Sequence, residues 1–194
     1  MKKLLALALI FISISFAAFA TPLIEVVDGN IDEFDIIDAS GSKILAGFAA
    51  ESDGYLIRVN AEPIEAISPL GELKIQENSL LAILDTEFSS PTLYLVYGSM
   101  SLYPSVTLEE MISIYTPTSK YEINGAGEYV FYSTDEREEF YNFGSLSAEA
   151  FNSITGQVYE VPSLYGVDML KKNGNPFEAS KEIYYANSLS FHRS

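Results

Sequence analysis

The 194-residue chain has 27 acidic and 11 basic residues, a net charge of −16, one histidine and no cysteine. Because phosphate binding depends on Lys and Arg, this balance argues against nucleic acid and anionic lipid surfaces as partners. Without cysteine the chain forms no disulfide and carries no lipid on a cysteine. Its 48% apolar content is enough for one domain with its own core.

The first twenty residues have the three parts of a secretory signal peptide. Lys2 and Lys3 form a basic start, residues 4–16 are apolar, and small residues at Ala18 and Ala20 form a cleavage point. An uncleaved membrane anchor is the alternative, but the apolar run is short for a span of about 20 residues. We therefore expect cleavage after Ala20, export to the periplasm or the exterior, and no transmembrane span in the mature chain.

Residues 23–37 predict two short strands around the turn Asp28-Gly29-Asn30, with Ile31 and Phe34 in the second strand. The spacing of Asp28, Asn30 and Asp32 resembles that of a calcium loop. However, the sequence has Glu33 where such a loop needs glycine and Ala39 where it needs a bidentate glutamate. We therefore expect no metal site there.

Between residues 44 and 84 short apolar runs alternate with turns such as Ser52-Asp53-Gly54 and Ser68-Pro69-Leu70-Gly71. This punctuation is typical of all-β proteins. A weak repeat, in which an apolar strand meets a glycine, recurs at Gly29, Gly98 and Gly144 with unequal spacing. We predict an all-β fold of many short strands in a β-helix-like roll, with an open β-sandwich as the second possibility.

The segment 111–132 predicts two strands joined by turns. Pro117 favours the end of an apolar strand, and Asn124-Gly125-Ala126-Gly127 tolerates the positive φ that a sharp corner needs. The β-branched and aromatic run 128–132 predicts the following strand. We expect the glycine corner to be structural and not a binding site.

This segment resembles the TPT-x(n)-V-R-G-T-x-F signature of the FecR domain through Thr116-Pro117-Thr118-Ser119, Ile123, Gly125 and Tyr129. The resemblance implies an all-β module of bacterial cell envelopes over residues 21–172, with a C-terminal extension at 173–194. Two positions depart from the signature, Asn124 where the family has Arg and Ala126 where it has Thr. FecR-type sigma regulators carry a cytosolic anti-sigma segment and a transmembrane helix ahead of the module. Because this chain starts with a signal peptide, their regulatory function is not expected to carry over.

Three segments allow simpler expectations. The acidic stretch 133–138 predicts an exposed hairpin loop. Thr107-Leu108-Glu109-Glu110 matches a capping box, although the alternation after it favours a strand. Residues 178–186 favour a short helix in the C-terminal extension.

The sequence offers little catalytic chemistry. The one histidine, His192, lies three residues from the end, so no Ser-His-Asp or Cys-His arrangement can form within the domain. Asp85-Thr86-Glu87 lacks the glycine of an aspartic-protease motif. The chain's 13 tyrosines and 12 phenylalanines are expected mainly in the core. We assign no catalytic, cofactor-binding or metal-binding residue and expect no cofactor.

Two functions remain open at this point. The favoured one is an exported, non-catalytic envelope protein that binds an envelope protein, a ligand or a cell-wall component through strand edges and loops. The alternative is a secreted hydrolase that uses a pair of carboxylates, because 27 acids make a close pair possible.

Overall fold

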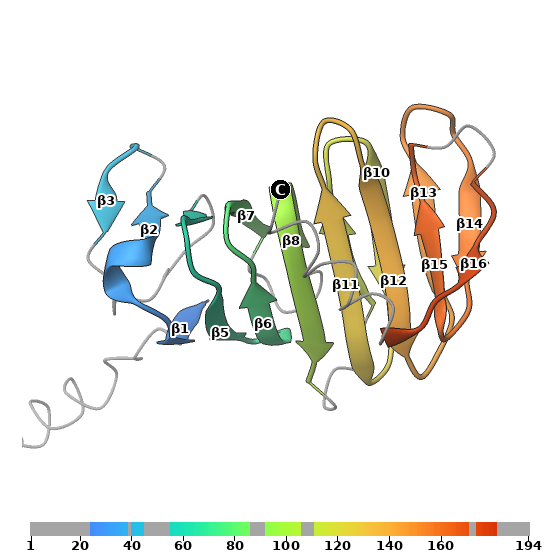
Figure 1. Ribbon diagram of the computed structural model, residues 1–194, viewed down its shortest axis with the longest axis horizontal. Coiled ribbons are helices and arrows are strands. Elements are labelled where there is room, and N and C mark those ends of the chain that lie inside the picture. The colour runs from blue at the N-terminus through green and yellow to red at the C-terminus, as the bar shows by residue number, and fades with distance from the viewer. Residues whose placement is uncertain are drawn as a thin grey trace, which may run out of the picture.

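The computed structural model describes residues 24–38, 40–44, 55–85, 92–105, 111–170 and 174–181, and it is nearly all β (Figure 1). Its elements are sixteen strands and one short 3-10 helix, Ile31–Glu33. The prediction of an all-β fold is confirmed. No helix among the described residues is both long and apolar enough to cross a membrane.

The strands form two layers that face each other. Layer A contains, in spatial order, β1 (Glu25–Asp28), β5 (Ile64–Ser68), β6 (Gly71–Ile75), β8 (Thr92–Pro104), β11 (Gly127–Ser133), β12 (Glu138–Gly144), β15 (Tyr165–Asp168) and β16 (Phe177–Glu178). Layer B contains β3 (Lys43–Ile44), β2 (Phe34–Ile37), β4 (Leu56–Val59), β7 (Ser79–Asp85), β8 again, β9 (Ile112–Tyr115), β10 (Ser119–Ile123), β13 (Ala148–Asn152) and β14 (Val158–Val161).

Strand β8 belongs to both layers and so joins all sixteen strands into one sheet. Its first half pairs with β7 and β9, and its second half pairs with β6 and β11. From β9 onward the chain places one hairpin in each layer in turn. All pairs among the described strands are antiparallel except β8 with β9. The molecule is therefore a roll of antiparallel hairpins whose layers pack like a sandwich, with β3 and β14 at opposite ends (Figure 1).

The core lies between the layers and follows the period of two that strands impose. An aromatic cluster of Tyr121, Tyr129, Phe131 and Phe140 is fully buried at its centre. The ring of Tyr121, from layer B, lies 5.4 Å from that of Phe131 and 4.9 Å from that of Phe140, both in layer A. These contacts fall in the range of favourable aromatic pairs, so the cluster holds the layers together.

The three glycines of the weak repeat stand where the chain leaves one layer for the other. Gly29 lies between β1 and β2, Gly98 lies at the bend of β8, and Gly144 precedes the crossing to β13. One expectation there is wrong, because Ile31 lies in the 3-10 helix and not in the second strand. Asn30 caps that helix by accepting a hydrogen bond from the Asp32 N–H at 3.2 Å, which favours a helical turn over an early strand.

The corner at residues 124–127 has the predicted backbone. Gly125 has a φ of +91° and Gly127 a φ of +127°. A Cβ on Gly127 would lie 2.5 Å from the Cα of Gly144 and 2.9 Å from the carbonyl oxygen of Phe143. The corner brings two backbones together more closely than any side chain allows.

Two further expectations are corrected. The loop after β11 contains only residues 134–137, because Ser133 and Glu138 are each 1% exposed and face the core. They are opposite each other in the β11–β12 register, on the same face as Phe131 and Phe140. Glu178, expected in a helix, lies in β16. Residues 107–110, 182–186 and His192 lie outside the described residues, as do Thr86 and Glu87.

The corner yields a test of backbone fit. Gly127→Ala should lower the free energy of unfolding by about 2 kcal/mol or more, because positive φ and a backbone clash both oppose the new Cβ. Gly156→Ala is the control, since Gly156 also has positive φ, +71°, but no atom within 4 Å of an added Cβ. It should cost about 1 kcal/mol. Thermal unfolding of both variants measures the difference. Equal losses of unfolding free energy would show that the backbone around Gly127 relaxes to accommodate the new Cβ.

Candidate interaction surface

A buried carboxylate explains the Thr-Pro-Thr-Ser turn. The Thr116 hydroxyl donates to Oε1 of Glu138 at 2.6 Å, and the Tyr121 hydroxyl approaches the same oxygen at 3.3 Å. Thr116 and Tyr121 come from the layer opposite Glu138, so this polar contact bridges the core. Burial, followed by the nearby Glu138 charge, raises the pKa of Tyr121, which therefore stays a neutral donor.

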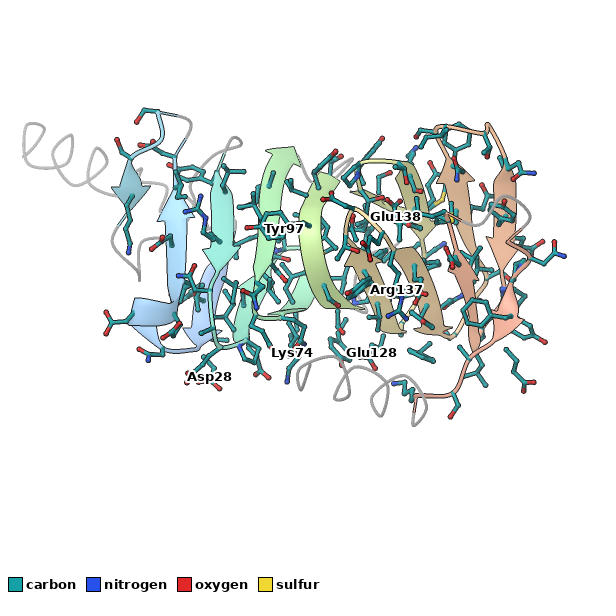
Figure 2. All side chains as sticks on the ribbon, turned by 45° about the horizontal axis from the view of Figure 1, so that its top comes forward. Asp28, Lys74, Tyr97, Glu128, Arg137 and Glu138 are labelled. Atoms are coloured by element: carbon teal, nitrogen blue, oxygen red, sulfur yellow. The ribbon has the colours of Figure 1, made fainter. Side chains whose placement is uncertain are left out.

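Other buried acids lie on the outer face of layer A and have partners in the chain. Arg137 holds Glu139 through two hydrogen bonds of 2.6 Å, and Lys181 lies 2.8 Å from Glu128, whose side chain is 2% exposed. Glu128 and Glu138 are labelled near opposite ends of the β11–β12 hairpin (Figure 2). These carboxylates serve as structural ion pairs and hydrogen-bond acceptors.

The segment 174–181 covers part of this outer face. The ring of Phe177 meets that of Tyr141 edge-on at 6.0 Å, and Lys181 lies 5.4 Å above the ring of Phe143. The Ala179 N–H donates to the carbonyl of Leu164 at 2.8 Å. The beginning of the C-terminal extension is thus packed against the domain.

A shallow depression of about 610 Å³ lies on the outer side of layer B. Its lining includes Arg58, Asn60, Glu77, Asn78 and Tyr97. Asn78 has a φ of +53°, and its N–H donates to the carbonyl of Asn60 at 2.8 Å. Within the described ranges no three His, Cys, Asp or Glu side chains are grouped to hold a metal.

Exposed apolar side chains are frequent in the C-terminal strands of both layers and in their connections. Seven of the twelve exposed large hydrophobic residues in the described chain lie between residues 146 and 177: Leu146, Phe151, Ile154, Val158, Leu164, Leu170 and Phe177. Among them Val158 is 60% and Ile154 73% exposed. Such clustering marks an interaction site more often than scattered exposure does.

The register of β10, β13 and β14 aligns outward side chains in two rows. One row contains Lys120, Phe151 and Val158, and continues to Tyr115 on β9. The other contains three glutamates opposite one another, Glu122, Glu149 and Glu160. We call these two rows, with Ile154 in the connecting turn, the β13–β14 surface.

The glutamate row is electrostatically unfavourable. Like charges directly opposite each other on neighbouring strands destabilise a sheet. Lys120 forms an ion pair with Glu122, which raises the pKa of Lys120. No ion pair involves Glu149 or Glu160 in the part of the chain that the structure describes. A basic partner would remove this repulsion.

This surface was not predicted from the sequence. The runs 148–152 and 158–161 alternate visibly, so the outward positions of each strand can be found from the sequence. The alignment with β10 cannot, because 24 residues and a hairpin in the other layer separate Ile123 from Ala148. Only the folded sheet brings Glu122 beside Glu149.

Comparison with known proteins defines the class of fold. No family model and no curated protein matches the sequence, so the FecR resemblance rests on the residues quoted above. Solved structures of proteins described as putative anti-sigma factors do match this fold.

Two of these structures come from Parabacteroides distasonis ATCC 8503. Each superposes with a TM-score of 0.56, at 13% and 12% sequence identity. The match covers 68% and 69% of this chain, and 62% and 64% of the other chains. This chain therefore matches less than two thirds of their length, and at this identity the likeness establishes the fold.

The buried carboxylate gives a second prediction. Glu138→Ala should lower the free energy of unfolding by about 2–4 kcal/mol, because it leaves a cavity and removes the acceptor for Thr116 and Tyr121. Glu138→Gln keeps an oxygen in place and should cost about 1 kcal/mol. Glu136→Ala, in the exposed turn, should change stability by less than about 0.5 kcal/mol. Urea unfolding measures all three, and a Glu138→Ala protein as stable as the parent would contradict the bridging role.

Proposed function

We propose that the protein is an exported, non-catalytic envelope protein that binds another protein through the β13–β14 surface. Export is supported by the signal-peptide pattern in residues 1–20. An envelope role is supported by the FecR resemblance around residues 116–131 and by the fold shared with the anti-sigma-factor structures. The observation that carries the proposal is the exposed apolar pair Phe151 and Val158 beside three aligned glutamates.

The chemistry of the acids supports a binding role over a hydrolytic one. Glu128, Glu138 and Glu139, which are buried, each engage a partner from the chain itself. Glu149 and Glu160 lie on an open sheet face. A hydrolase needs two carboxylates on either side of a bond held in a cleft, and the β13–β14 surface presents its acids in a line.

The shape of the surface supports a protein partner over a small ligand. Small ligands bind in concave sites that enclose most of their area, whereas Phe151, Val158 and Ile154 project from a sheet face and a turn. An apolar patch bordered by charges resembles the centre and rim of a protein interface. We therefore assign this end of the molecule to a partner in the periplasm or outside the cell.

Export is tested by N-terminal sequencing of the protein recovered from fractionated cells. The mature protein should begin at Thr21 and leave the cytosolic fraction, because the leader directs export and is removed at Ala20. An intact Met1 in a membrane pellet would mean that residues 1–20 act as an anchor.

Binding is tested with a photo-crosslinking amino acid introduced at Val158 in cells that make the protein. The residue is 60% exposed on the edge strand of the surface, so one discrete protein adduct should form on illumination. The matched control carries the same amino acid at Glu72, which is exposed on the outer face of layer A. Absence of an adduct at position 158, or identical adducts at both positions, would contradict the proposal.

A further inference from the structure

Resting on the proposed function, we propose that the partner adds a β-strand to the free edge of β14. This strand places a basic side chain beside Glu160 and an apolar side chain beside Val158. The partner class is therefore a protein with an extended segment in which apolar and basic residues alternate on one face.

The outer edge of β14 has backbone N–H and carbonyl groups oriented for such an addition. The Asn152 N–H donates to the carbonyl of Gln157 at 2.9 Å, so Asn152 directs its N–H toward β14. Hydrogen-bonded pairs recur at every second position of an antiparallel ladder, so Tyr159 and Val161 are bonded to β13 in the same way. Val158 and Glu160 then direct their N–H and carbonyl groups away from β13.

That outer edge pairs with no strand in the described part of the chain, since β14 ends the strand order of layer B. An unpaired edge offers donors and acceptors to an incoming strand. Val158 and Glu160 supply two N–H groups and two carbonyls, enough for one segment of about four residues to dock in register.

The side chains set the pattern of that segment. On the outer face it would extend both rows by one strand, opposite Val158 and Glu160. A lysine or arginine beside Glu160 would compensate the charge that now faces Glu149. On the inner face it would cover Tyr159, which is only half-buried, whereas Val161 is already buried in the core. Read from the N-terminus of an antiparallel strand, the residues opposite Glu160, Tyr159 and Val158 are therefore basic, apolar and apolar.

The partner's charge also agrees with the charge of the whole chain. At a net charge of −16 the protein attracts basic segments and repels acidic ones, which raises the rate of encounter with the proposed partner. Overall charge is not local recognition, so the experiment must separate the two.

The probe is a fluorescent ten-residue peptide with Val-Lys-Ile-Val between polar ends, titrated against residues 21–194 and followed by anisotropy. Saturable binding is expected, and Glu160→Lys should weaken it at least tenfold because attraction becomes repulsion. Glu72→Lys changes the net charge equally, far from the edge, and should alter the affinity less than twofold. A peptide with Glu in place of Lys should show the reverse preference for the Glu160→Lys protein.

The backbone contribution is tested with Val158→Pro. Proline removes one N–H that points away from β13 and is tolerated on edge strands. Binding should fall at least fivefold, while the melting temperature stays within a few degrees of the parent. If the proline variant unfolds, Glu160→Lys with its Glu72→Lys control still decides the question.

The outcomes separate this inference from the proposed function. Strand addition would be refuted if an adduct formed at position 158 but the peptide did not bind, or bound Glu160→Lys and Glu72→Lys equally. The proposed binding function would still be supported in both cases. No adduct at position 158 would refute both. Peptide binding that depends on Glu160 and on the Val158 N–H would support the edge as the docking site.

Discussion

The close approach of β8 to β7 at Gly98 is the constraint on which the two layers depend. Gly98 has a φ of +98°, and an added Cβ would lie 2.2 Å from the hydroxyl oxygen and 2.6 Å from the Cα of Ser79. The Ser79 hydroxyl accepts from the Ser99 N–H at 3.0 Å and lies 3.2 Å from the Ser99 carbonyl. The serine thus gives the Ser99 N–H a partner at the bend, while the Ser99 carbonyl also accepts from the Gln76 N–H at 3.0 Å, and one strand can belong to both layers.

Once β8 connects the layers, the hairpins on each side need only bury their inward residues. In the N-terminal half this core is formed by aliphatic residues such as Ile57, Leu73 and Leu81. In the C-terminal half the aromatic cluster and the contact of Glu138 with Thr116 fill the same space. A buried carboxylate is costly unless it is hydrogen-bonded, which accounts for the polar turn opposite it.

Much of the fold was predictable from the sequence because its signals are local. Alternating residues, turn dipeptides and glycines predicted many short strands, although β10 was missed, because two strands were predicted where β9, β10 and β11 lie. The burial of Glu138 was missed because an acidic stretch normally indicates exposure, and only the pairing with Ser133 shows that its side chain faces inward. The β13–β14 surface was missed for a related reason. Register between strands distant in sequence is set by the whole sheet.

Edge protection is the main competing explanation for Glu160, since proteins often place charges on edge strands to prevent aggregation. It explains one charge at the edge, but Glu122 and Glu149 lie on interior strands, where no edge needs protection. Val158 and Phe151 argue against edge protection, because they expose apolar surface beside the unpaired backbone of β14 and so favour association. A surface that combines costly charge alignment with exposed apolar side chains is better explained by a partner that satisfies both.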